Sequence, residues 1–236
     1  SKVSKLEKEI ASIKSRKLNY VGKIFFLINN CKLLGTLPFA GVARCAFIST
    51  KLLKSFLKKK IISNKEYSNI YSSNKSVQRD INNILLRRGP KKFLEKFGHL
   101  RPFTYQITSK NYKEAHKNYF NRKELKFIKR EKFNISKKSI KLINKELRKK
   151  KFNFTAKKFI NFAKESIYQR ERVKLIFTKS IDEIFLNLIN LGKEIDLNRN
   201  HLEHLTINFI KDAYNNLEAF RLKKKIKTQL KENIEQ

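Results

Sequence analysis

Glycine and proline are scarce in this sequence of 236 residues, which contains six glycines and three prolines. A β-sheet protein of this length would need many tight turns, and tight turns depend on these two residue types. Leucine, isoleucine, phenylalanine and lysine instead form runs with an apolar residue at every third or fourth position, which is the spacing of one helix face. Because 40% of the residues are hydrophobic, such helices can bury a core. We therefore predict an all-α fold.

Cysteine is scarcer still, and the only two, Cys31 and Cys45, lie among apolar residues. Two cysteines without clustered histidines provide neither a disulfide framework nor the ligand spacing of a zinc site. We expect both to be buried free thiols. His201 and His204 are three residues apart, but no HExxH motif or third ligand accompanies them, so no metal site is expected.

Long hydrophobic runs are also missing. No apolar stretch approaches the roughly 20 residues that a membrane-spanning helix requires. The chain does not open on the charged, apolar and small-residue pattern of a signal peptide. We therefore expect a cytoplasmic protein without a membrane partner.

Acidic residues are few: Lys and Arg number 56 and Asp and Glu number 20, which gives a formal charge of +36. Such an excess attracts polyanions, so one hypothesis is a non-enzymatic basic helical protein that binds nucleic acid. Residues 122–151 are especially basic, with 14 cations against three acids. The interpretation that we favour is a solvated face of two helices, with Ile128 and Ile143 among the inward residues. A nucleic-acid partner is then not expected.

Start and stop signals divide the first half of the chain. An amphipathic helix opens it, and the apolar stretch 20–34 should end at Gly35 and turn through Pro38 into a second, largely buried helix. Ser63 and Glu66 have the spacing of a capping box, which predicts a short helix there.

In the second part of the chain the predicted helices are longer. Gly89 followed by Pro90 predicts a break between helices at 76–88 and 91–97. The longest predicted helix runs from about Thr155 to Leu191 and ends at Gly192. Asn198 and Thr206 are the predicted N-caps of two further helices.

Residues 99–111 lose the helical period and carry the first candidate site. His99, Arg101, Thr104 and Tyr105 provide an imidazole, a guanidinium, a hydroxyl and a phenol within a few positions. Such a set suits a phosphorylated or carboxylate ligand, because Arg forms a bidentate fork and His can donate to the anion or relay a proton. Alternatively, His99 and Arg101 only satisfy the ends of nearby helices. The residues alone do not favour either interpretation.

The second candidate site lies on the long predicted helix. Arg170, Lys174 and Thr178 recur every four residues, and Glu171 and Asp182 lie near the same face. This pattern is typical of a solvated helix face, the interpretation that the residues alone favour. It could also line a pocket for a zwitterion, with an acid binding the ammonium group and Arg170 or Lys174 the carboxylate.

These segments resemble the central region of phosphoenolpyruvate-synthase-like (PEP-utilising) phosphotransferases from bacterial capsule clusters. The likeness lies in residues 34–44, in residues 97–102 with Thr104 and Tyr105, and in residues 170–179 with 205–207. Within this family the closest match is the glutamine-kinase group of capsular phosphoramidate biosynthesis. Phe103 and Gln106 stand where the family's loop has Gly and Asp.

The resemblance implies that residues 1–236 are the helical, acceptor-binding domain of a larger kinase, divisible into sub-lobes 1–120 and 121–236. An ATP-grasp domain of the same polypeptide would bind ATP and Mg, and a histidine of a swivelling domain would carry the phosphoryl group. Neither pattern occurs in this sequence, which also lacks a Walker loop. We expect the fragment alone to hold no cofactor and to be inactive.

The resemblance also implies roles for single residues. The acceptor would be L-glutamine, phosphorylated on its side-chain amide nitrogen, or another small molecule. His99 and Arg101 are the predicted catalytic residues, with Arg101 neutralising the transferring phosphoryl and His99 acting as a base. The predicted substrate-binding residues are Arg44, Thr104, Tyr105, Arg170, Glu171, Lys174 and Thr178.

Overall fold

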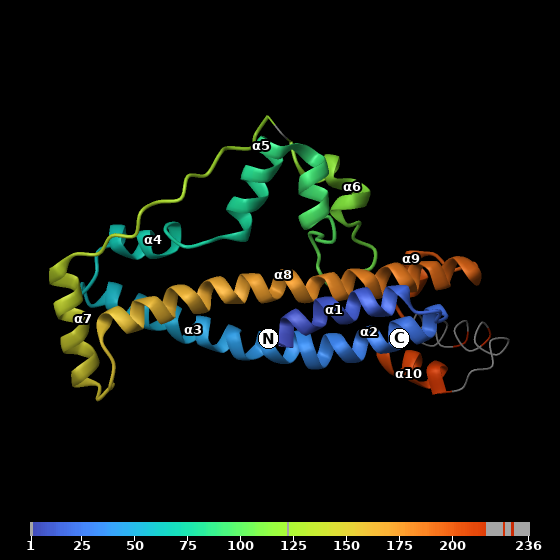
Figure 1. Ribbon diagram of the computed structural model, residues 1–236, viewed down its shortest axis with the longest axis horizontal. Helices are drawn as coiled ribbons and strands as arrows, with labels where there is room; N and C mark the ends of the chain where they lie inside the picture. The colour runs from blue at the N-terminus through green and yellow to red at the C-terminus, as the bar shows by residue number, and fades with distance from the viewer. Residues whose placement is uncertain (1, 122, 216–223, 225–227, 229–236) are drawn as a thin grey trace. The chain divides into compact units, whose positions relative to one another are not determined.

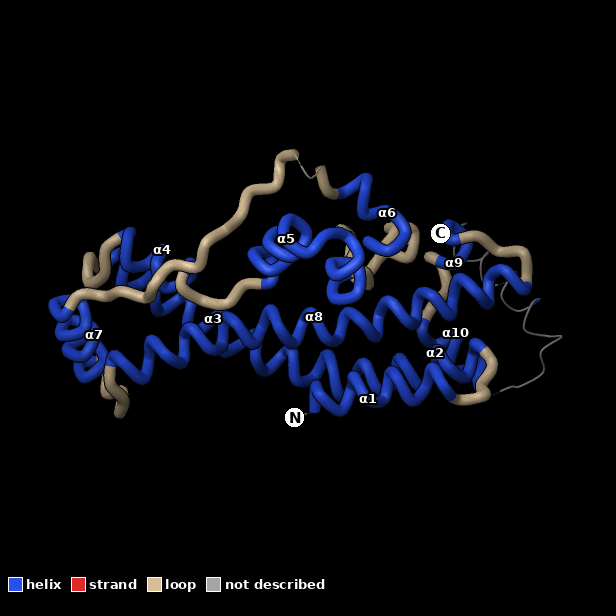
Figure 2. The backbone as a smooth tube through the Cα atoms, turned by 45° about the horizontal axis from the view of Figure 1, so that its top comes forward, coloured by secondary structure: helices blue, strands red, loops and turns tan. Residues whose placement is uncertain are grey.

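The computed structural model describes residues 2–121 and 123–215, together with residues 224 and 228. The helices in chain order are α1 (Lys2–Ser15), α2 (Tyr20–Asn30), the π-helix η1 (Cys31–Thr36), α3 (Leu37–Lys58), α4 (Asn64–Ser72), α5 (Val77–Phe97), α6 (Tyr112–Tyr119), α7 (Lys137–Lys149), α8 (Ala156–Glu194), α9 (Arg199–Leu202) and α10 (Ile207–Asn215). Figure 2 shows these helices joined by loops, with no strand among the described residues. The predicted all-α class is confirmed.

The chain folds into two compact units, and each is built from separate stretches of the sequence. Unit 1 contains residues 1–37, 93–121 and 175–236, and unit 2 contains residues 38–92 and 122–174. The sequence instead suggested consecutive sub-lobes, 1–120 and 121–236. The division differs because α8 contributes residues up to Lys174 to unit 2 and residues from Leu175 onward to unit 1.

Unit 1 is held together by the apolar faces of its helices. Figure 1 shows α1 lying along α2, and the side of α1 that carries Leu6 and Ile13 is buried. A second cluster joins Ile24 of α2 to Leu191 of α8 and Ile210 of α10. The predicted amphipathic helix at the start of the chain is therefore confirmed, because its apolar spacing matches the buried face.

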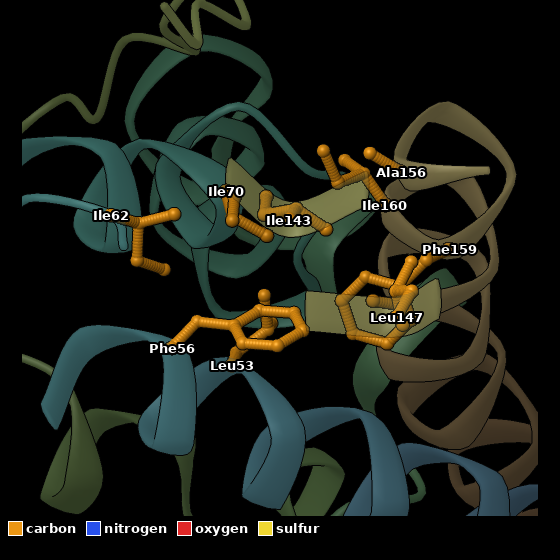
Figure 3. Packing of buried hydrophobic residues seen from close by; sticks show 10 residues of the cluster. Leu53, Phe56, Ile62, Ile70, Ile143, Leu147, Ala156, Phe159 and Ile160 are labelled. Atoms are coloured by element: carbon orange, nitrogen blue, oxygen red, sulfur yellow. The ribbon is translucent and has the colours of Figure 1, made fainter. Parts of the chain in front are cut away.

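Unit 2 has its own core, formed by α3, α4, α7 and the first part of α8. Figure 3 shows Phe56 of α3 directed toward Leu147 of α7 and Phe159 of α8. The rings of Phe56 and Phe159 meet edge to face, with centroids 5.5 Å apart and an interplanar angle of 76°. Edge-to-face pairs add to the stabilisation that comes from area burial.

The predicted turn at residues 35–38 is wrong, since the helix continues from α2 through η1 into α3. Pro38 lacks the backbone N–H that an α-helix would use, and it lies where the π-helical turn η1 passes into α3. The N–H of Leu37 accordingly donates to the carbonyl of Lys32, five residues back. Gly35 lies in this turn and is buried.

Gly35 allows two other parts of unit 1 to approach η1 closely. A Cβ atom at this position would lie 2.8 Å from the Cβ of Phe177 and 3.1 Å from Cδ2 of Leu6. Gly35→Ala is expected to lower the free energy of unfolding by about 1–3 kcal/mol, because the added methyl overpacks this contact. Urea denaturation followed by circular dichroism measures the change.

The matched control for this substitution is Gly41→Ala in α3, where nothing lies within 4 Å of an added Cβ. There the helix propensity of alanine should stabilise the protein by about 0.5–1 kcal/mol. A loss of stability equal to that of Gly35→Ala would show that the close packing at η1 is not the cause.

The continuous helix Tyr20–Lys58 is long and apolar enough to cross a membrane by length and composition, and most of its most apolar stretch is not buried. The sequence had instead suggested that no apolar stretch approaches the length of a membrane-spanning helix.

Most other start and stop signals are confirmed. Both hydrogen bonds of the capping box formed by Ser63 and Glu66 are present, and Gly89 breaks α5 with φ at 74°. Asn198 caps α9 through the N–H of His201, and the Thr206 hydroxyl accepts from the N–H of Phe209 at 3.2 Å.

The two predicted helices within 122–151 are partly wrong, because α7 is the only helix among the described residues 123–151. The described residues before α7 form a turn at 123–124 and no regular secondary structure at 125–136, and asparagine side chains of α4 and α5 bind their backbone. Asn83 donates to the carbonyl of Ile128 at 2.9 Å, and Asn69 donates to that of Lys132 at 3.0 Å. Ile128, predicted to face inward, is 39% exposed, whereas Ile143 is buried as expected.

The two cysteines are free, as predicted. Cys31 is buried at the start of η1, and burial raises the pKa of its thiol above the ordinary value. Cys45 is half-buried in α3 rather than fully enclosed.

Candidate functional site

The candidate loop begins where α5 ends and closes where α6 begins, within unit 1. A Cβ atom at Gly98 would lie 2.4 Å from the carbonyl oxygen of Leu94, so only glycine fits this helix end. The base of the loop is fixed by backbone hydrogen bonds from Lys113 to the carbonyl of Gly98 at 3.1 Å and from Tyr112 to that of Leu100 at 2.8 Å. These hydrogen bonds hold the two ends of the loop next to each other.

Arg101 tethers the N-terminal part of this loop, its first arm, to α8. Its guanidinium is buried, forms an ion pair with Asp182 and donates from Nη1 to the carbonyl of Ser109 at 3.1 Å. The Arg101 guanidinium also lies 4.8 Å from the ring centroid of Phe185, a cation–π distance. Burial raises the pKa of the Asp182 carboxyl, while Asn111 and Arg101 act in the opposite direction.

Asn111 tethers the second arm to the same acid. Its amide nitrogen donates to Asp182 Oδ1 at 2.9 Å, while its own Oδ1 accepts from the N–H of Glu114 and caps α6. Both arms of the loop thus meet one carboxylate on α8, so its shape depends on one network. A buried network in which every group has a partner holds one conformation.

His99 is half-buried beside α8. Its Nε2 lies 3.0 Å from the carbonyl oxygen of Leu175, which can only accept, so Nε2 carries the proton. Burial lowers the pKa of His99 to about 4, the Leu175 carbonyl opposes this, and Lys179, Lys113 and Arg101 lower it further. The imidazole is therefore neutral at pH 7, which leaves Nδ1 as a weak base.

The remaining loop candidates differ in exposure. Tyr105 is 67% exposed, and Thr104 is half-buried. Thr178 is buried on α8, where its hydroxyl donates to the carbonyl of Leu175 at 3.0 Å. Of these residues, Tyr105 is the one whose side chain is open to a ligand.

The other predicted site residues belong to unit 2. Arg44 and Lys174 are exposed, and Arg170 lies over the ring of Phe47 with its guanidinium carbon 5.0 Å from the centroid. Glu171 accepts a hydrogen bond at 2.9 Å from the N–H of Val77, the first residue of α5. Glu171 therefore accepts from a free backbone N–H at the N-terminus of α5, a role that carboxylates commonly perform.

A cavity in unit 1, called here the loop pocket, has the tip of the loop as one wall. Its volume is about 540 Å³, within the range of small-molecule sites. The walls from α2 and α8 are apolar, and the polar groups lie on its remaining sides. The polar lining residues are Tyr105, Gln106, Glu203, His204 and Thr206.

Sequence reasoning missed most of this lining. Gln106 was noted only as a departure from the family's loop, His204 as a weak metal candidate and Thr206 as a helix cap. Only Tyr105 was among the predicted binding residues. No spacing rule connects positions about 100 residues apart, so the loop pocket could not be recognised before the fold was known.

Groups that could bind a metal ion are few in this structure. Among the described residues, no three His, Cys, Asp or Glu side chains gather closely enough to hold one. His201 accepts at Nδ1 from the N–H of Asn198 at 3.2 Å and belongs to the cap of α9. His204 lies beside Glu203, with Nε2 and Oε1 3.8 Å apart.

No family model, no curated protein and no solved structure matches this chain. The resemblance of the His-Leu-Arg-Pro loop to phosphotransferases therefore remains a prediction.

Proposed function

We propose that this chain is the acceptor-binding part of a phosphohistidine-mediated phosphotransferase, with a polar amino acid such as L-glutamine as the acceptor in the loop pocket. The observation that carries the proposal is the tethering of the loop. Arg101 and Asn111 hold both arms on Asp182, and this fixes Tyr105 and Gln106 against a pocket of small-molecule size. Rigid support of this kind is what substrate positioning requires.

The chemistry of the loop pocket suits an amino acid with a polar side chain. The Glu203 carboxylate can accept from an ammonium group, and the Gln106 amide can both donate to and accept from another amide. The apolar wall from α2 and α8 suits the methylene groups between them. Such a division between an apolar body and a few polar contacts is typical of small-molecule sites.

The roles of the two predicted catalytic residues change under this proposal. Arg101 acts as a positioning residue, since both of its terminal nitrogens are engaged within the protein. His99 does not line the loop pocket and, with a pKa of about 4, would be a weak base, so it is not proposed to contact the acceptor there. ATP and Mg would be bound by other domains, and this chain would contribute orientation.

Gln106→Ala tests the proposal, because Gln106 is exposed and its side chain has no hydrogen bond among the described residues. L-Glutamine should bind the wild-type protein, and the substitution should weaken binding about tenfold through the loss of amide hydrogen bonds. Isothermal titration calorimetry with a panel of amino acids and pyruvate measures this.

The matched control is Gln78→Ala, an exposed glutamine at the start of α5 in unit 2. It should bind L-glutamine as the wild type does. Binding of pyruvate with no heat from any amino acid would contradict the proposed acceptor. Equal affinity in the two glutamine variants would exclude the loop pocket as its site.

A further inference from the structure

Unit 2 contains a large open cavity, which we call the basic groove. Its volume is about 1520 Å³, and it lies between the end of α3, the start of α4, the segment 129–136 and the start of α7. Exposed cations line both sides of it: Lys58, Lys60, Lys65, Lys129, Arg130, Lys132 and Lys138. The loop pocket of unit 1 shares none of these residues.

The two acids of the basic groove, Glu66 and Glu131, offset only part of the charge of these seven cations. Glu66 accepts hydrogen bonds from the N–H groups of Ser63 at 2.8 Å and Ser136 at 2.9 Å and from the Ser139 hydroxyl at 3.0 Å. Although burial alone would raise the pKa of Glu66, these bonds lower it to about 2. The Glu66 carboxylate is therefore held by hydrogen bonds from neutral donors, and it caps the N-termini of α4 and α7.

Glu131 is engaged in the same way. It accepts from the Ser72 hydroxyl at 2.6 Å and from the Asn69 amide at 3.0 Å. Among the residues that the structure describes, no ion pair joins any of the seven cations to an acid. The groove therefore carries a concentrated positive charge that an external anion can neutralise.

The size and surface of the basic groove indicate the form of that anion. A volume of about 1520 Å³ exceeds the 300–1000 Å³ or so that a small ligand fills. Cations on both walls fit a ligand with charges repeated along its length. The lining also includes apolar side chains, among them Leu57, Ile61 and Ile135, which are half-buried.

The types of the cations are compatible with phosphate ligands. Six of the seven are lysines, which bind phosphate as point charges, whereas the fork of arginine recognises phosphate and carboxylate alike. The only arginine, Arg130, already donates from Nε to the carbonyl of Ser73 at 2.7 Å.

We propose that the basic groove binds a single-stranded nucleic acid, with its phosphates on the lysines and its unpaired bases on the apolar side chains of the lining. A duplex fits less well, because its bases are paired and only its phosphates and sugars would reach the groove. This inference does not depend on the function proposed for unit 1, since it concerns other residues and another ligand.

The test replaces Lys65, Lys132 and Lys138 together with glutamine. Lys65 and Lys138 lie in the first turns of α4 and α7, where removing a cation does not weaken a helix, so the variant should fold. Binding is measured by fluorescence anisotropy with an oligothymidylate of about 20 nucleotides, longer than typical single-strand sites. Salt is varied from about 0.05 to 0.5 M.

Because the three lysines are proposed to contact three phosphates, the negative slope of log affinity against log salt should be shallower by about 2 in the triple variant. If wild type and variant bind equally at about 1 M salt, this difference in slope makes the variant bind roughly hundredfold more weakly than the wild type at about 0.1 M salt. The matched control replaces Lys51, Lys54 and Lys157, which are exposed in unit 2 outside the groove. It loses the same charge and should bind within a few-fold of the wild type.

Several outcomes would overturn the proposal. Equal losses in the groove and control variants would show that only net charge matters. A duplex or a poly-glutamate peptide that binds as tightly as the single strand and depends on the same lysines would identify another occupant. Complete displacement by inorganic tripolyphosphate at equal phosphate concentration would show that bases make no contribution.

Discussion

Arg101→Met is expected to lower the free energy of unfolding by about 3–5 kcal/mol, the cost of removing one partner from a buried ion pair. The Arg101 and Asp182 side chains are 4% and 3% exposed, so the remaining carboxylate would be buried without its counter-charge. The first arm of the loop would also lose its bond from Nη1 to Ser109. Chemical denaturation at pH 7 measures the change.

Two further variants separate the ion pair from a general effect of substitution. Arg88→Met, at an exposed position of α5, should change stability by less than about 0.5 kcal/mol. Adding Asp182→Asn to Arg101→Met removes both charges and keeps an acceptor for Asn111. We expect this double variant to regain at least half of the loss. If Arg101→Met unfolds as Arg88→Met does, the network does not hold the loop.

The second large effect is a pH dependence of stability that comes from His99. Its pKa is about 4 in the folded protein and about 6.5 in an unfolded chain. As pH falls below about 6.5, the unfolded state takes up the proton first, so the folded state loses stability until pH reaches about 4. Between pH 7.5 and 5 the expected loss is about 2 kcal/mol.

His99→Gln provides the comparison for this prediction. A glutamine amide can still donate to the Leu175 carbonyl but does not titrate, so the variant should lack this part of the pH dependence. The quantity to measure is the difference between the unfolding free energies of wild type and variant at each pH. A difference that stays constant from pH 5 to pH 7.5 would contradict a buried, neutral imidazole.

These two predictions also bear on the proposed function. If Arg101 positions the loop, Arg101→Met should weaken L-glutamine binding in parallel with the loss of loop structure, and the double variant should restore both. A direct contact between Arg101 and an anionic ligand would not be restored by Asp182→Asn. The pair of variants therefore distinguishes a positioning residue from a binding residue.

Local signals in the sequence determined much of the secondary structure. Apolar residues at three- and four-residue spacing predicted an amphipathic helix at the position of α1 and the bounds of α8 within a few residues, because burial of one face fixes a helix register. Ser63 with Glu66, Gly89 with Pro90, and Asn198 marked helix ends correctly. Each of these signals acts within one helical turn, so neighbours in the sequence contain the whole interaction.

The errors occurred where partners distant in the sequence decide the conformation. Gly35 does not end a helix, because Leu6 and Phe177 pack against it and the helix continues through the π-helical turn η1. The lysine-rich residues 125–136 before α7 have no regular secondary structure, because Asn69 and Asn83 satisfy their backbone. In both cases a contact across many residues outweighs the local propensity.

For the candidate site, too, the sequence determined some features and the tertiary structure determined others. The sequence by itself identified the loop that carries His99, Arg101 and Tyr105, because unusual residue types gather there. Only the tertiary structure decided that Arg101 is buried against Asp182, and that Tyr105 borders a pocket together with His204. A side chain's chemistry is read from its identity, but whether it meets ligand, solvent or another charge depends on burial, and burial is set by the packing of the helices.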